Sequence, residues 1–167
     1  LRKRSLIEGL KRLLMLRPTE VLQSAVDQVR APRTRVLVAE DNPVNQKVIM
    51  AILKSLRCDG TVADDGAAAV AAMEKESFDV ILMDYQMPKL DGPAAARQIR
   101  AMEKERQIDI TQQTPIIALT ANAGPEFEAE CKDAGMDAFL GKPVHKGKLR
   151  DALWKLTAHK GRSPIGP

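Results

Sequence analysis

Three carboxylates, a threonine and a lysine each lie at or just beyond the end of a short apolar run. They are Glu40, Asp41, Asp84, Thr120 and Lys142. Carboxylates gathered in one place repel each other and raise at least one pKa, and a hard divalent cation relieves that repulsion. Few oxygen ligands, with room for water and phosphate, favour Mg²⁺ over Ca²⁺. With an ammonium and a hydroxyl beside them, these groups describe a site that could receive a phosphoryl group on Asp84.

Each of these residues also has a structural interpretation. An acid that follows a strand often caps the next helix, and Asp41 or Asn42 could serve that purpose. Taken alone, any one of the positions is more often structural than functional. All five stand at predicted strand ends, however, in an order that one sheet can bring together. This combination favours the phosphoryl site.

The elements that position these residues alternate along the chain from residue 35 onward. The short segments are continuously apolar, which is typical of strands buried on both faces of a parallel sheet. The predicted strands are 36–39, 61–63, 78–83, 115–119 and 137–140, and the predicted helices are 43–57, 66–75, 92–105, 125–134 (with a glycine C-cap at 135) and 146–158. We therefore expect an α/β fold with a doubly wound, five-stranded parallel sheet, whose chemistry lies at the carboxyl ends of its strands.

Composition narrows the class of protein further. The chain is 44% hydrophobic and 29% charged, an ordinary balance for a folded domain. Only 3% of its residues are aromatic, which argues against a binder of single-stranded nucleic acid. Its two cysteines, Cys58 and Cys131, lack the spacing of a zinc site. No apolar run approaches the length of a spanning helix, and we expect a cytoplasmic protein with no direct membrane insertion.

Four stretches of the sequence resemble the receiver domain of response regulators. They are VLVAEDNPVN at 36–45, DVILMDYQMPKLDG at 79–92, TPIIALTANA at 114–123 and GMDAFLGKP at 135–143. The resemblance covers residues 34–159 and implies the flavodoxin-like receiver fold. The first stretch is most similar to receivers at the C-terminal end of hybrid sensor histidine kinases.

The resemblance implies a role for each residue of the acidic cluster. Asp84 matches the phosphoacceptor, and Lys142 matches the lysine that contacts the phosphoryl group. Asp41 matches the direct Mg²⁺ ligand, and Glu40 matches the acid that acts on the metal through a water. Gln86 stands where a backbone carbonyl completes the metal site, although its side chain differs from those commonly found there.

The resemblance also implies a conformational switch. Thr120 matches the hydroxyl that moves toward the phosphoryl group, and Phe139 matches the aromatic residue that turns inward behind it. Because Phe139 lacks a phenol oxygen, it cannot make the hydrogen bond available to a tyrosine there. The Lys142-Pro143 peptide bond is expected to be cis, as only X-Pro bonds commonly are.

The N-terminal part of the chain stands apart from this pattern. Residues 1–35 hold nine lysines and arginines against three acids, whereas the remainder holds 17 against 19. Residues 1–13 also match 144–156 without gaps in apolar and charged positions. We therefore expect an N-terminal helical extension over 1–33, comprising the last helix of an upstream receiver-like domain and a linker helix. The receiver domain follows over 34–159, and a disordered tail over 160–167.

The function implied is that of a phosphorelay receiver, which takes a phosphoryl group from phosphohistidine onto Asp84 with Mg²⁺. It then switches conformation or passes the phosphate on. The expected partners are a histidine kinase core in the same parent chain and a histidine phosphotransfer protein, with a receiver–receiver contact or homodimer also possible. The sequence carries no kinase core, and whether the protein is an enzyme stays open. We expect no DNA-binding domain.

The sequence leaves two alternative functions. A phosphohydrolase with an aspartyl-phosphate intermediate carries a second acid two residues after its nucleophile, where this chain has Gln86. A phosphate-independent regulatory domain could instead bind an anionic ligand or a nucleotide messenger through its basic linker. Arg30, Arg33 and Arg35 would carry that binding.

Overall fold

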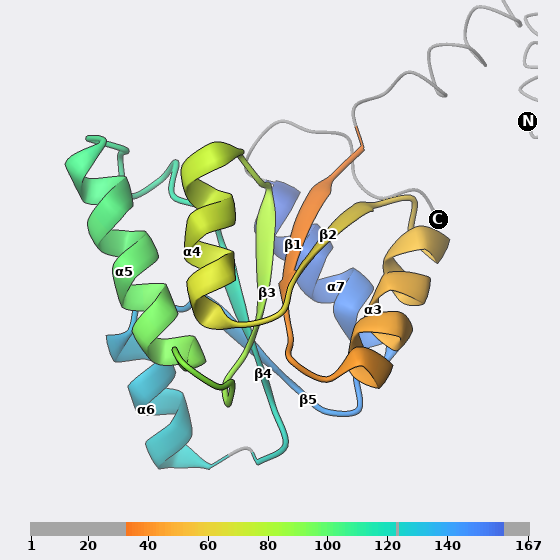
Figure 1. Ribbon diagram of the computed structural model, residues 1–167. Helices are drawn as coiled ribbons and strands as arrows, with labels where there is room; N and C mark the ends of the chain where they lie inside the picture. The colour runs from red at the N-terminus through yellow and green to blue at the C-terminus, as the bar shows by residue number, and fades with distance from the viewer. Residues whose placement is uncertain (1–32, 123, 159–167) are drawn as a thin grey trace, which may run out of the picture. The chain divides into compact units, whose positions relative to one another are not determined.

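The computed structural model describes residues 33–122 and 124–158. Within them, five parallel strands form one sheet in the order β2-β1-β3-β4-β5 (Figure 1). The strands are β1 (Arg35–Ala39), β2 (Asp59–Ala63), β3 (Val80–Asp84), β4 (Ile116–Thr120) and β5 (Ala138–Gly141). The chain order reverses between the central strands β1 and β3, and in folds of this kind the crevice at their carboxyl ends is where ligands bind.

Helices cover both faces of the sheet. They are α3 (Pro43–Ser55), α4 (Gly66–Lys75), α5 (Gly92–Glu105), α6 (Pro125–Asp133) and α7 (Lys146–Thr157). Helices α4, α5 and α6 share one buried apolar cluster with the sheet, and α3 and α7 share the other (Figure 1). The doubly wound architecture predicted from the continuous apolar runs is therefore confirmed.

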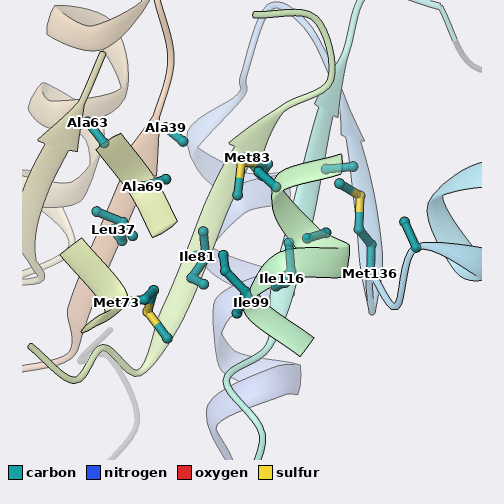
Figure 2. Close-up of a cluster of buried hydrophobic side chains, with 14 of the residues drawn as sticks. Leu37, Ala39, Ala63, Ala69, Met73, Ile81, Met83, Ile99, Ile116 and Met136 are labelled. Atoms are coloured by element: carbon teal, nitrogen blue, oxygen red, sulfur yellow. The ribbon is translucent and has the colours of Figure 1, made fainter. Parts of the chain in front are cut away.

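The central strands supply both apolar clusters because successive side chains of a strand point to opposite faces. Figure 2 shows Leu37, Ile81 and Ile116 of three neighbouring strands in one cluster, together with Met73 of α4 and Ile99 of α5. Every residue of β3 and of β4 is buried. A buried sheet of this kind holds the ends of its strands rigidly, which is what a site at those ends requires.

Specific residues begin and end the helices next to the site. The Asn42 side chain caps α3, where its Oδ1 accepts hydrogen bonds from the amides of Val44 at 2.9 Å and Asn45 at 3.3 Å. Gly135 follows α6 with a φ of +83°, the left-handed conformation of a glycine C-cap. Both features agree with the sequence prediction.

Two predicted boundaries differ from the structure in an informative way. The helix expected over 43–57 ends at Ser55, because Arg57 adopts a left-handed φ of 57° and turns the chain toward β2. The strand expected over 61–63 begins at Asp59, which pairs with Arg35 at the edge of the sheet. An edge strand tolerates polar residues such as Asp59, so an apolar run marks only part of it.

Several sequence predictions concern other parts of the chain. The upstream receiver-like helix, the linker helix and the tail over 160–167 lie outside the described residues. None of the described helices is both long and apolar enough to cross a membrane.

Candidate functional site

The sheet brings the five predicted site residues to one edge. Asp84 ends β3 and Thr120 ends β4, while Glu40 and Asp41 directly follow β1 and Lys142 directly follows β5. All five line an open pocket of about 500 Å³. The five residues predicted from strand ends therefore lie together in space.

The three carboxylates converge in the pocket. Each of Glu40, Asp41 and Asp84 offers one oxygen, and these oxygens lie within 4.8 Å of one another. Glu40 is fully buried and Asp84 nearly so, whereas Asp41 is exposed. The α3 N-terminus follows the acids directly, and its positive dipole end favours negative charge there.

Lys142 joins two of the carboxylates. Its Nζ lies 2.8 Å from Glu40 Oε2 and 2.8 Å from Asp84 Oδ2. The Lys142 amide donates to the Thr120 carbonyl at 2.7 Å, which fixes the lysine backbone beside β4. The following bond, Lys142-Pro143, is cis, as expected.

Burial and neighbouring charges shift the pKa values of Asp84 and Lys142. Burial is the largest cause that raises the pKa of Asp84; the Glu40 charge also raises it, and Lys142 opposes both. Burial alone would lower the pKa of Lys142, but the carboxylates of Asp84 and Glu40 outweigh it and raise that pKa. The Lys142 ammonium therefore stays charged, whereas burial and the Glu40 charge disfavour the ionised form of the Asp84 carboxyl.

The donor set fits a divalent cation. Glu40 Oε2 is buried and accepts no hydrogen bond of ordinary geometry, although Lys142 Nζ lies 2.8 Å away. One ammonium shared by Glu40 and Asp84 does not balance three carboxylates, and a divalent cation would relieve the remaining repulsion among them. Oxygen ligands from carboxylates are those that Mg²⁺ prefers. Gln86 also lines the pocket, and its backbone amide donates to Asp84 Oδ1 at 3.3 Å.

The predicted switch residues are Thr120 and Phe139. Among the described residues, no hydrogen bond joins either of them to Asp84. Thr120 Oγ1 donates to the Asn122 carbonyl at 2.6 Å and accepts from the Asn122 amide at 3.0 Å. Phe139 stands on β5 with 41% of its surface exposed. The threonine hydroxyl is thus held by its own loop, and the aromatic ring faces outward.

Two contacts at the site escaped the sequence reasoning. Asn45 Nδ2 donates to Glu40 Oε1 at 3.0 Å. On the opposite wall, the Tyr85 hydroxyl donates to the Glu130 carboxylate, and the Tyr85 ring packs on Phe127 with ring centroids 4.5 Å apart. The position of Asn45 in the first turn after the acids could have indicated the first contact, whereas nothing in the sequence pairs Tyr85 with a helix so distant along the chain.

The basic linker considered as an anion site is partly engaged within the domain. Arg33 pairs with Asp59 at 3.3 Å. Arg35 pairs with Glu76, donates to the Ser77 carbonyl at 2.8 Å, and lies over the Phe78 ring. Arg30 lies outside the described residues. The two described arginines therefore already have anionic partners.

Together, the strand order and a carboxylate cluster faced by a lysine and a threonine define a receiver domain. The chain belongs to this family, since the model of the response regulator receiver domain matches residues 36–154. A similar curated protein is the sensor protein GacS of Pseudomonas syringae, 35% identical over 160 residues, which are 87% of this chain and 17% of the relative. The chain thus spans less than a fifth of that relative's length.

Solved structures agree with this assignment. The receiver domain of sensor histidine kinase PA1611 from Pseudomonas aeruginosa, which has a magnesium ion coordinated in its active-site cleft, is 42% identical with a TM-score of 0.67. That match covers 76% of this chain and 99% of the other. The receiver domain of Ssk1 in complex with the histidine phosphotransfer protein Ypd1, from Saccharomyces cerevisiae, has a TM-score of 0.72 at 28% identity, covering 77% and 92%.

Proposed function

We propose that this receiver accepts a phosphoryl group from a phosphohistidine onto Asp84, with Mg²⁺ bound at Glu40, Asp41 and Asp84. The observation that carries the proposal is the position of Lys142, whose ammonium contacts both Glu40 and Asp84 at 2.8 Å. A cation held against the nucleophile is placed to neutralise the charge that develops on a transferred phosphoryl group. The family assignment supports the same chemistry.

In the proposed reaction, an Asp84 carboxylate oxygen forms a bond to phosphorus while the bond from phosphorus to the imidazole nitrogen breaks. The imidazole leaves with the electron pair of that bond and takes up a proton. In-line phosphoryl transfer leaves little covalent chemistry to the rest of the protein. Positioning of the reactants and stabilisation of charge therefore do most of the catalysis. The backbone amide of Gln86, 3.3 Å from Asp84 Oδ1, orients the nucleophile.

The acids would hold the metal through their oxygens, with the backbone carbonyl of Gln86 as a further ligand. When bound, Mg²⁺ supplies positive charge to the phosphoryl oxygens. Lys142 and Asn45 hold the side chain of the fully buried Glu40 in place at the site. Magnesium in the active-site cleft of the PA1611 receiver supports this assignment.

Phosphorylation is proposed to act on the Thr120 and Phe139 side chains. In the structure Thr120 Oγ1 donates to the Asn122 carbonyl and Phe139 is 41% exposed. A phosphoryl oxygen on Asp84 offers Thr120 Oγ1 a stronger, charged acceptor. We propose that the hydroxyl then turns toward it and leaves space into which the Phe139 ring moves, so that the surface at β5 changes.

A histidine-bearing partner would dock beside the pocket. Val44 and Val48 lie one helical turn apart on α3 and are 66% and 47% exposed. An apolar strip next to a charged pocket suits a protein partner that presents a phosphohistidine. The complex of the similar Ssk1 receiver with Ypd1 supports a histidine phosphotransfer protein as that partner, and the likeness to GacS supports a hybrid histidine kinase as the parent protein.

The test is the intact mass of the protein after incubation with acetyl phosphate. One added phosphoryl group is expected, only with Mg²⁺, and none in Asp84→Asn. Asp133→Asn, which alters an exposed carboxylate on α6, is the matched control and should gain the group as wild type does. Equal phosphorylation of Asp84→Asn, or no phosphorylation of folded wild-type protein, would overturn the proposal.

A further inference from the structure

We propose that Asn45 is a positioning residue that fixes the Glu40 carboxylate for Mg²⁺ binding, an inference that rests on the function proposed above. Asn45 stands in the first turn of α3, after the turn that carries the acids. Its Nδ2 donates to Glu40 Oε1 at 3.0 Å, and its side chain lines the pocket. It therefore contacts a proposed metal-site acid directly, from the helix that follows that acid.

The two oxygens of Glu40 have different surroundings. Oε1 accepts from Asn45 Nδ2 at 3.0 Å and from the Asn42 amide at 3.3 Å. Oε2 accepts no hydrogen bond of ordinary geometry and lies 2.8 Å from Lys142 Nζ. Because both donors hold Oε1, the carboxylate cannot rotate freely, and Oε2 is the oxygen kept for the lysine and the cation.

The arrangement differs from ordinary helix capping. In a capping box, the side chain at the third helical position accepts a hydrogen bond from the backbone amide of the capping residue. Here the backbone amide of Asn42 and the side-chain amide of Asn45 both donate to the Glu40 carboxylate. The first turn of α3 therefore directs its donors at the buried carboxylate. Without Asn45, Oε1 would keep only the longer contact with Asn42.

The neighbouring residue Gln46 provides a matched comparison. Its Nε2 donates to the Glu40 backbone carbonyl at 2.7 Å and to Asp64 Oδ1 at 3.0 Å. Gln46→Leu thus removes an amide donor from the same helical turn and the same acidic residue, but not from the carboxylate. Asn45→Leu replaces the donor with an apolar side chain of the same branched shape, and Asn45→Ser shortens the side chain so that its hydroxyl no longer reaches Glu40 Oε1 as the amide does.

The test is calorimetric titration of the full chain with Mg²⁺ alone, without a phosphodonor. Loss of a group that orients a metal ligand typically weakens metal affinity by about tenfold or more. We expect about that loss in both Asn45 variants and a clearly smaller one in Gln46→Leu. Thermal unfolding without Mg²⁺ is measured in parallel, because loss of a donor to a buried carboxylate also lowers stability. A merely structural role would lower the melting temperature and leave the Kd for Mg²⁺ unchanged.

The results separate this inference from the proposed function. Wild-type affinity for Mg²⁺ in both Asn45 variants, or an equal loss in Gln46→Leu, would overturn the role of Asn45 and leave phosphorylation of Asp84 standing. If wild-type protein binds Mg²⁺ and loses that affinity in the Asn45 variants but is not phosphorylated, the positioning role stands and the proposed function fails. Wild-type protein that binds no Mg²⁺ would overturn both.

Discussion

Lys142 Nζ lies 2.8 Å from Asp84 Oδ2, although Asp84 ends β3 and Lys142 follows β5, with β4 between these two strands in the sheet. The lysine reaches the acid because both stand at the carboxyl ends of strands on one edge of the sheet, and the same ammonium also contacts Glu40 at 2.8 Å. Removing either partner therefore leaves a buried charge with fewer neighbours. The chemistry and the stability of the site depend on the same contact.

Lys142→Met should slow phosphorylation of Asp84 by acetyl phosphate by about 10²-fold, the loss typical when one stabilising donor is removed from an active site. The ammonium also lowers the pKa of Asp84, so its loss leaves burial and Glu40 to raise that pKa further. The measurement is the initial rate from intact mass at saturating Mg²⁺. Lys148→Met, which alters an exposed lysine on α7, is the control, and an equal loss there would contradict a specific role.

The apolar strip of α3 should matter only to a protein phosphodonor. Val44→Ser combined with Val48→Ser is expected to slow phosphotransfer from a phosphorylated histidine phosphotransfer protein by about tenfold, since it removes a small part of a docking surface. Phosphorylation by acetyl phosphate measures the integrity of the site in the same variant. Unchanged transfer from the protein donor would place the docking surface elsewhere.

Arg100 should be a major contributor to stability on the face away from the pocket. Its guanidinium donates to Glu103 Oε2 at 2.6 Å and to the Gly135 carbonyl at 2.9 Å, and Glu103 is almost completely buried. Arg100→Met removes the cation from that buried carboxylate, which then keeps only the hydrogen bond from the Thr114 backbone amide at 2.8 Å. Loss of one partner of a buried ion pair costs about 3 kcal/mol or more in comparable cases. The measurement is the free energy of unfolding in urea.

A second variant tests the cause of that loss. In a Glu103→Gln background no buried charge is left behind, so Arg100→Met should cost clearly less there. An equal loss in both backgrounds would show that the pair with Glu103 does not carry the effect. Packing, the ion pair with Asp137 or the bonds to the Thr114 and Gly135 carbonyls would then carry it.

Cys58 should make stability fall at alkaline pH. Burial is the largest cause that raises the pKa of its thiol from 9.0 to about 11, with the charges of Asp59 and Asp79 adding to it. The unfolded chain therefore loses this proton at lower pH than the folded one. The contribution of Cys58 is complete below pH 9 and declines by about 1.4 kcal/mol per pH unit between the two pKa values.

The check is the pH dependence of urea unfolding for wild type and Cys58→Ala. The variant has its own loss from the missing side chain, so the slope against pH is compared rather than the absolute free energy. We expect a flatter slope for Cys58→Ala above pH 9. Parallel slopes would contradict a thiol held protonated by burial.

The sequence predicted the sheet well because every central strand is buried on both faces and therefore continuously apolar. It also placed Asp84, Thr120 and Lys142 correctly, since a strand end fixes position along the chain and in space at once. It missed the start of β2 at Asp59, where an edge position removes the need for apolar residues. The left-handed Arg57, which ends α3 early, carries no local signal comparable to a glycine.

Side-chain contacts across the pocket were the least predictable part of the site. The hydrogen bond from Asn45 to Glu40 depends on the direction of one side chain in a helical turn. The Tyr85 contact with Glu130 depends on where α6 lies over the sheet, which packing of the whole domain decides. Residue type and spacing therefore identify which groups do chemistry, whereas the groups that hold them require the folded structure.

The central claim is that Asp84 itself carries the phosphoryl group, and the most direct measurement is to locate the modified residue. Borohydride reduces an acyl phosphate to an alcohol and so converts a phosphorylated aspartate to homoserine. After treatment with acetyl phosphate and Mg²⁺, reduction and peptide mass mapping should find homoserine at position 84 and nowhere else. Homoserine at position 41, or phosphate retained on a different residue with Asp84 unmodified, would contradict the account.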